Sequence, residues 1–180
     1  MNQLSSDRKQ RLGSSFNHPA AIGTKVRTKI ERGDRYSAPE IYDLDITVLQ
    51  SVRGEEAMVR LKNDAALKEK KKPGFDYILA HLQIGIYSKG RGFGRSVQPY
   101  VIEKEFFGLA SDNGQLIEDV SVINSRFEGQ LIGMSLTPGK TCEGSIAFQV
   151  PSVESNPLIV FKRDYRLNTY GEWPAIWFCI

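Results

Sequence analysis

The segment DYILAHLQIGIY, residues 76–87, carries the clearest structural pattern in this 180-residue chain. Apolar residues recur at every second position from Ile78 to Ile86, and polar residues such as His81 and Gln83 fall between them. Successive side chains of a strand point to opposite faces of a sheet, so this alternation predicts a β-strand with one face in the core. It is the strongest strand prediction in the chain.

The preceding segment, SVRGEEAMVRLKNDAALKEKKKPGF at residues 51–75, instead predicts a helix. Met58, Leu61 and Ala65 are spaced so that they share one helical face. A helix of this length is marginal alone in water and needs tertiary packing. We therefore expect residues 55–67 to form a crossover helix between sheet edges, with its apolar stripe covering an open end of the core and Leu61 buried.

The charges at the two ends of this segment support the helix prediction. Glu55 and Glu56 lie in the first turn, where the helix dipole favours negative charge. Four lysines lie between residues 68 and 72, and Pro73-Gly74 follows as a stop signal. We interpret the lysines as a solvated helix end, and we expect the last three, residues 70–72, to be exposed.

Shorter patterns complete an all-β prediction. Residues 41–52 and 142–151 alternate with period two, and residues 22–30, 156–163 and 172–180 are shorter β-rich stretches. Asn113-Gly114 predicts a hairpin turn, and residues 136–141 predict a second turn. About seven or eight strands joined by turns predict one antiparallel β-sandwich. We expect its core between two sheets to contain Ile46, Val48, Ile78, Leu82, Ile84, Ile146, Phe148, Val150 and Phe178.

The composition predicts one globular domain preceded by a tail. Residues 1–20 are polar with few bulky apolar side chains, which predicts a flexible solvated tail, and residues 21–180 form the domain. Hydrophobic residues make up 41% of the chain and charged residues 25%, as in ordinary globular domains. The net charge of +3 is too mild to indicate a dedicated nucleic-acid binder. The sequence contains neither a membrane-spanning apolar run nor a signal-peptide core.

The order of these elements also resembles a known family. IGT near the start, VRGEEA after a strand, PGFDYILAHLQI, SDNG, PG before EGSIAFQVP, NPLIVF and a terminal W-F strand resemble the telokin-like domain of unknown function. That domain occurs in bacterial lipoproteins and secreted proteins. The resemblance covers about residues 20–180, and it implies an immunoglobulin-like fold and an extracellular or cell-envelope location. The family brings no catalytic residues to carry over, and its lipobox cysteine has no counterpart before Cys142.

A glycine- and arginine-rich loop is the best candidate for a binding surface. KGRGFGRSVQPY, residues 89–100, contains RGFG, the opening of an RNA-recognition signature, but Arg95 replaces the aromatic residue that should follow. Lys89, Arg91 and Arg95 beside Phe93 would nevertheless suit an acidic partner or a single-stranded nucleic acid. The alternative is an ordinary hairpin loop.

The remaining chemical signals are weak. Asp43 and Asp45 share a strand face and are expected to face solvent rather than to hold calcium. His81 is expected to pack or hydrogen-bond across the sheet, because no nucleophile signature accompanies it. PGKT at residues 138–141 lacks the upstream glycine and the following helix of a phosphate-binding loop.

Only two cysteines are present, too few for a disulfide framework. Cys142 shares strand parity with core residues and is expected to point inward, whereas Cys179 shares parity with Trp177. A bridge between them and two free thiols both remain open. No residue pattern predicts a cofactor or a metal site.

Together these patterns predict a non-enzymatic binding or interaction module, and the resemblance implies that it belongs to the bacterial cell envelope. Its partner would be a protein or an envelope component, and it would meet a membrane only through a lipid anchor. The alternative is an intracellular binder of nucleic acid or another acidic ligand, working through Lys68–Lys72 and the loop from Lys89 to Arg95. An enzyme ranks third, because no catalytic constellation is recognisable.

Overall fold

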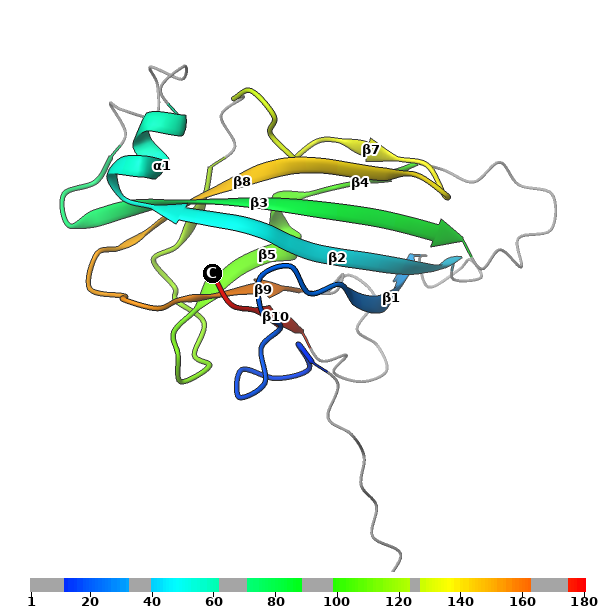
Figure 1. The fold of residues 1–180 in the computed structure, drawn as a ribbon, viewed down its shortest axis with the longest axis horizontal. Coiled ribbons are helices and arrows are strands. Elements are labelled where there is room, and N and C mark those ends of the chain that lie inside the picture. The colour runs from blue at the N-terminus through cyan, green and yellow to red at the C-terminus, as the bar shows by residue number, and fades with distance from the viewer. Residues whose placement is uncertain (1–11, 33–39, 62–70, 89–98, 124–126, 163–174) are drawn as a thin grey trace, which may run out of the picture.

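A five-stranded antiparallel sheet dominates the computed structural model, which describes residues 12–32, 40–61, 71–88, 99–123, 127–162 and 175–180 (Figure 1). The sheet has the order β1-β2-β3-β8-β6, and each neighbouring pair is antiparallel. The bounds are Val26–Arg32 for β1, Glu40–Arg53 for β2, Phe75–Ser88 for β3, Ser121–Val122 for β6 and Thr141–Pro151 for β8. The predicted all-β class is confirmed, and β3 forms the centre of this sheet.

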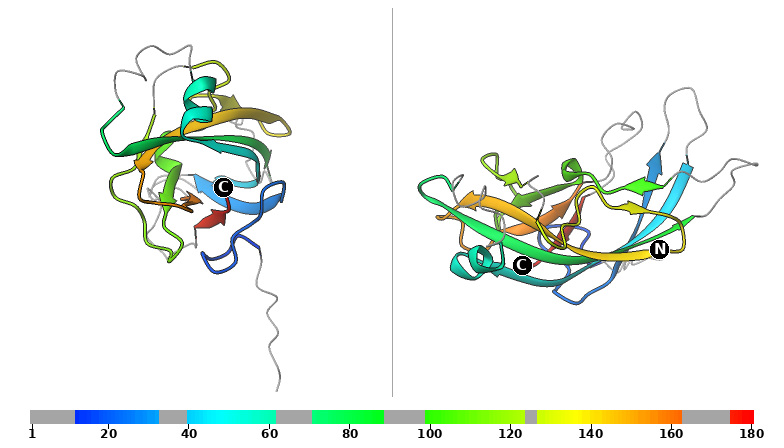
Figure 2. Two further views of the ribbon diagram at one scale, coloured as in Figure 1. Left: turned by 60° about the vertical axis from the view of Figure 1, so that its left-hand side comes forward. Right: turned by 90° about the horizontal axis from the view of Figure 1, so that it is seen from above.

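A second layer lies across one face of this sheet (Figure 2). It contains three antiparallel strands in the order β10-β9-β5, with bounds Ile176–Phe178, Leu158–Phe161 and Phe107–Ala110. A two-stranded sheet pairs β4, Tyr100–Val101, with β7, Ser135–Leu136. A 3-10 turn, Lys104–Phe106, leads into β5.

The core occupies the face of the large sheet that the second layer covers. All nine residues predicted for it belong to one buried hydrophobic cluster, and none is more than 2% exposed. Phe161 and Phe107 from the second layer pack edge to face in the same cluster, with ring centroids 5.5 Å apart. The period-two pattern of the sequence therefore located the core correctly.

A β-bulge at Leu49 reverses the side-chain alternation of β2. Val48 pairs with Leu82, but Gln50 pairs with His81, so one extra residue lies between the two pairs. Before the bulge, Leu44, Ile46 and Val48 face the core. After it, Val52 faces the outer side of the sheet and joins a second apolar cluster with Leu79. The sequence pattern gave no indication of this change of face.

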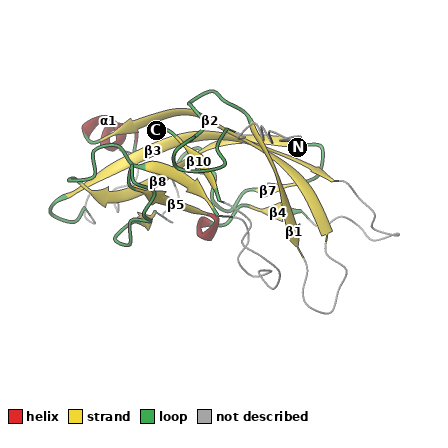
Figure 3. Ribbon diagram, turned by 90° about the horizontal axis from the view of Figure 1, so that it is seen from below, coloured by secondary structure: helices red, strands yellow, loops and turns green. Residues whose placement is uncertain are grey.

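The predicted crossover helix differs from the observed one. The helix α1 comprises only Glu55–Arg60, and residues 62–70 lie outside the described part of the chain (Figure 3). Because β2 and β3 are directly paired neighbours, α1 belongs to the connection of a long hairpin and does not cross between sheet edges. Leu61 is buried as predicted, together with Ala57. Both pack in the second cluster on the outer face, so α1 covers that face and not an open end of the main core.

The segment 12–20 also differs from its prediction. Gly13 accepts a hydrogen bond from the backbone of Trp177, and Ala20 donates one to the Trp177 carbonyl. Ala20 is fully buried, and the ring of Phe16 packs against that of Trp177 with centroids 6.1 Å apart. A polar composition does not prevent a backbone from pairing with a neighbouring strand, so the solvated tail does not extend to Ala20. Residues 1–11 lie outside the described part.

The two predicted turns are present. Gly114 has a φ of 84°, and the N–H of Gln115 bonds to the side chain of Asn113, which closes the turn after β5. Gly139 has the same φ and precedes β8. Both glycines adopt a left-handed conformation that disfavours other residues.

Candidate functional site

The residues predicted as a binding surface, Lys89, Arg91, Phe93 and Arg95, lie outside the described residues. The structure shows only that their loop joins β3 to β4. Of the lysines after α1, Lys71 and Lys72 are described, and both are exposed as predicted. The Lys72 ammonium lies 5.2 Å from the centre of the Phe75 ring, in a cation–π contact.

The structure reveals a different candidate, on the outer surface of the five-stranded sheet. Here side chains of four adjacent strands form polar contacts with one another across the strands, beyond the part of the surface that α1 covers. We call this group the polar face. It consists of Arg27 from β1, Asp45 from β2, His81, Gln83 and Tyr87 from β3, and Glu143 and Ser145 from β8.

One end of the polar face is built around a bidentate ion pair. Arg27 and Asp45 are register partners, and Arg27 donates from Nε to Oδ1 over 2.6 Å and from Nη2 to Oδ2 over 2.8 Å. The Asp45 side chain is only 6% exposed, against 66% for Arg27. The expectation that Asp43 and Asp45 face solvent is wrong, since both are buried. Arg27 therefore pairs with a buried carboxylate while most of its own side chain remains exposed.

This pairing changes the acidity of both groups. The hydrogen bond from Arg27 is the main cause that lowers the pKa of the Asp45 carboxyl, and partial burial opposes it. The same hydrogen bond is the main cause that raises the pKa of Arg27. Asp45 is therefore ionised at neutral pH, and the pair presents a fixed guanidinium at the surface.

A glycine in β3 makes room for an aromatic ring beside this pair. Gly85 is the register partner of Asp45. A Cβ at Gly85 would lie 3.1 Å from the Tyr87 hydroxyl and 3.2 Å from Oγ1 of Thr141, closer than side chains normally pack. The missing side chain allows the Tyr87 ring to lie over this position, with the Arg27 guanidinium 5.5 Å from the ring centre.

The other end of the polar face joins β3 to β8. Gln83 donates to the Glu143 carboxylate over 2.6 Å, and Nδ1 of His81 lies 3.1 Å from the Ser145 hydroxyl. Nε2 of His81 lies 3.8 Å from Oε2 of Glu143, which is too long for a hydrogen bond. The predicted cross-sheet hydrogen-bonding role of His81 is confirmed. The register pairs His81 with Ser145 and Gln83 with Glu143, so each contact follows from strand pairing.

Ser145, His81 and Glu143 lie near one another, and they are the residue types found in the catalytic triads of hydrolases. A hydrolytic serine needs backbone N–H donors aimed at the developing oxyanion. The Ser145 N–H already donates to the carbonyl of Gly129 over 2.7 Å, so it cannot serve as such a donor. The long distance between His81 and Glu143 also leaves the imidazole without a hydrogen-bonded carboxylate. The geometry favours a polar contact surface over a hydrolytic site.

The described residues contain no group of three or more histidine, cysteine, aspartate or glutamate side chains placed to hold a metal ion. No described helix is long and apolar enough to cross a membrane. Cys142 and Cys179 are both free thiols. Cys142 packs against the core as predicted, and desolvation, with a smaller contribution from Glu143, raises the pKa of its thiol.

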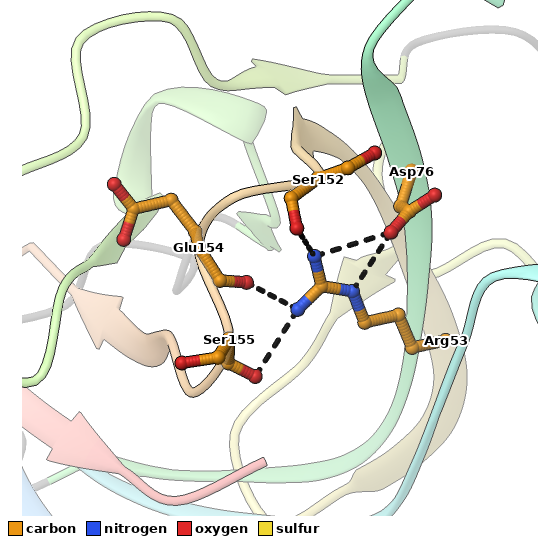
Figure 4. A network of polar contacts seen from close by, with 5 residues as sticks. All are labelled: Arg53, Asp76, Ser152, Glu154 and Ser155. Carbon is orange, nitrogen blue, oxygen red and sulfur yellow. Dashed lines mark hydrogen bonds and ion pairs between the residues drawn. The ribbon is translucent and has the colours of Figure 1, made fainter.

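A second polar network lies at the end of β2, outside the polar face (Figure 4). Arg53 pairs with Asp76 over 3.2 Å and donates to the backbone carbonyls of Ser152, Glu154 and Ser155, which follow β8. The side chains of Arg53 and Asp76 are each 27% exposed. One guanidinium thus connects the β8–β9 connection to the β2–β3 hairpin.

The residues of VRGEEA, 52–57, that surround Arg53 also have structural roles. Gly54 has a φ of 63°, which favours glycine, and its N–H bonds to the Tyr77 carbonyl. Glu55 and Glu56 form the first turn of α1. Ala57 is fully buried against the sheet. The most distinctive motif of the chain therefore builds a corner of the fold, and it contributes no chemistry to the polar face.

The polar face could not be predicted from the sequence, because its members lie far apart in the chain. The period-two pattern does place Arg27, Asp45, Gln83 and Glu143 on strands, opposite the core residues. What it lacks is the register, which decides which of these residues meet. One signal of the polar face is present in β3, at the positions opposite the core. These positions are apolar near α1, and farther along the strand they are polar or, at position 85, glycine.

Comparison of the chain with protein-family models, with curated proteins and with solved structures gives no match.

Proposed function

We propose that this protein is a non-enzymatic binding module and that the polar face is its recognition surface, with a protein as the partner. The observation that carries the proposal is the set of cross-strand contacts that holds seven polar and aromatic side chains in place on one face of the sheet. Arginine and tyrosine are the residue types that most often dominate binding energy at protein interfaces. Arg27 and Tyr87 supply them here.

Pre-organisation and partial exposure support this proposal. The side chains of His81 and Glu143 are 39% and 51% exposed, so a partner can reach them. Side chains already held by hydrogen bonds lose less conformational entropy when a partner binds. The backbone of β3, which carries His81, Gln83 and Tyr87, is paired on both sides, through β2 and β8.

The fold and location implied by the telokin-like resemblance belong to this proposal. We propose a β-sandwich, supported by the layered sheets and the single core between them. The immunoglobulin strand order finds no support, because that order places the third strand in the opposite sheet, whereas β1, β2 and β3 are neighbours in one sheet. The cell-envelope location is tested by fractionating the native cells and probing each fraction with an antibody.

A matched pair of charge reversals tests the recognition surface. Glu143→Lys changes the polar face, and Glu105→Lys changes an exposed glutamate of the 3-10 turn before β5. Wild-type protein and both variants are immobilised and incubated with extract of the native cells, and bound proteins are quantified by mass spectrometry. A partner retained by wild type and by Glu105→Lys, but at least tenfold less by Glu143→Lys, supports the proposal. The same bound proteins on all three would contradict it.

The non-enzymatic part of the proposal has its own test. Activity is screened against a panel of ester, amide and phosphoester substrates. Turnover that disappears in Ser145→Ala, with the fold intact by circular dichroism, would show that the contact with His81 is catalytic. We expect no substrate to be turned over.

Binding of nucleic acid is a second candidate, and the exposed Lys71 and Lys72 favour it. Such binding weakens steeply as salt rises, because neutralised phosphates release their counterions. Retention on single-stranded DNA at low salt that is lost at moderate salt would support this candidate. No retention at low salt would remove it.

A further inference from the structure

Within the described part of the chain, the outer edge of β1 is an unpaired margin of the five-stranded sheet. β1 lies at the end of the strand order and pairs with β2 along all seven of its residues, Val26–Arg32 (Figure 1). No other described strand pairs with it. In an antiparallel ladder the backbone groups of alternate residues point to opposite sides, so about half of the N–H and C=O groups of β1 point away from β2. Such an edge is a template for one more strand.

The length of the edge suits a short extended segment. The segment 12–20 approaches the beginning of β1, where a Cβ at Gly13 would lie 3.4 Å from a methyl group of Val26. The remainder, from Arg27 to Arg32, contains no proline. This run offers the main-chain pairing by which extended peptides add to a sheet.

The exposed side chains at the beginning of this edge, within residues 25–29, all carry the same charge. Lys25, Arg27 and Lys29 are exposed, whereas Val26 and Thr28 between them are buried. The three cations therefore line one surface at every second residue. An added strand would place alternate side chains about 5 Å from them. Carboxylates at every second position of that strand would face these cations.

The same charges argue against pairing of β1 with a second copy of itself. An antiparallel pair centred on Lys29 would set Lys29 directly opposite its own symmetry mate, and like charges in that position are unfavourable. Lysines on edge strands are a known protection against self-association. They leave the edge open to a strand of opposite charge.

We propose that the free edge of β1 binds an extended acidic segment of a partner protein by strand addition. Backbone hydrogen bonds supply the affinity, and Lys25, Arg27 and Lys29 select segments with carboxylates at alternate positions. Arg27 contributes while it remains paired with Asp45, because its side chain is two-thirds exposed and the pair uses one side of the guanidinium. The proposal does not depend on the polar face having a partner.

The probes are three fluorescein-labelled peptides of eight residues that alternate valine with a charged residue. The first carries glutamate, the second carries lysine, and the third carries glutamate with alternate backbone nitrogens methylated. Fluorescence anisotropy measures binding, and amide chemical shifts locate it. We expect the first peptide to bind with shifts centred on residues 26–32, and the other two to bind at least tenfold more weakly. Methylation removes the backbone donors without changing charge, so it separates strand addition from simple attraction.

Matched charge reversals on the protein complete the test. Lys29→Glu should weaken the glutamate peptide at least tenfold and strengthen the lysine peptide, whereas Lys71→Glu, an exposed lysine away from β1, should change neither. Equal binding of the methylated and unmethylated glutamate peptides would overturn the proposal, as would no binding at millimolar concentration. A dimer in solution that Lys29→Glu abolishes would also overturn it, because a second copy would then occupy the edge.

Discussion

Replacement of Arg53 by methionine tests whether one guanidinium fastens the β8–β9 connection. The substitution keeps an unbranched stem of similar length but removes the donors to Asp76 and to the three carbonyls that follow β8. Hydrogen bonds to charged groups contribute about 1.5–3 kcal/mol each when sheltered, and exposed ion pairs contribute about 0.2–1 kcal/mol. Both side chains are about one quarter exposed, so we expect a net loss near 2 kcal/mol, and a fall in Tm of about 4–8 °C.

Arg60→Met provides the matched control. Arg60 also forms an ion pair, over 2.8 Å to Glu56 in α1, but the two side chains are 41% and 60% exposed. Arginine and methionine have similar helix propensities, so the backbone cost is the same. Pairs of this kind on a helix contribute about 0.3–0.5 kcal/mol, so we expect a loss of at most about 0.5 kcal/mol.

Urea denaturation followed by far-ultraviolet circular dichroism measures both variants. The expected result for Arg53→Met is a lower denaturation midpoint with an unchanged slope, which indicates lost stability and not a changed unfolding reaction. A double-mutant cycle with Asp76→Asn should show a coupling energy, since the two residues share one contact. Equal stability of Arg53→Met and Arg60→Met would refute the reasoning, because the network would then be no stronger than an ordinary surface pair.

Three further outcomes follow from burial and charge. Leu61→Asp should lower the free energy of unfolding by at least about 3 kcal/mol, because it forces a carboxylate against apolar surface. Replacing both Lys71 and Lys72 with glutamine should change the free energy of unfolding by at most about 1 kcal/mol, even though the cation–π contact of Lys72 is lost. Phe148→Ala should cost about 3–5 kcal/mol, again by urea denaturation, and a cost below about 1 kcal/mol would show that the core closes around the deletion. Asp45→Asn should be less stable than wild type at neutral pH, and this difference should shrink as the pH falls below 3.8, since a carboxyl with a lowered pKa stabilises the fold only while ionised. A difference that persists unchanged at pH 3 would show that the ion pair with Arg27 is not its cause.

The sequence predicted the core because burial leaves a local trace. Residues such as Ile78, Leu82 and Ile84 repeat with the period of a strand, and each is buried in the main cluster. Their pattern does not depend on which strand lies beside them. The turns at Gly114 and Gly139 could be predicted in the same way, because a left-handed backbone favours glycine at the turn position itself.

The polar face could not be predicted in the same way, because its contacts depend on register. Asp45 was expected to face solvent, since alternation shows only that it lies opposite the core. Its ion-pair partner Arg27 lies 18 residues earlier in the chain, and its register partner Gly85, beside which the Tyr87 ring fits, lies 40 residues later. The prediction of a solvated tail was wrong for residues 12–20 for a related reason, because their partner Trp177 lies at the other end of the chain.

The bulge at Leu49 connects these features, because it decides which residues share the outer surface of the sheet. Before the bulge, Asp45 projects outward and forms part of the polar face. After the bulge, Val52 projects outward and packs with Leu79 beneath α1. The parity change also turns Arg53 to the side of the sheet on which the connection after β8 lies. A single extra residue thus divides the outer surface of β2 into an apolar part that packs beneath α1 and a polar part that pairs with Arg27.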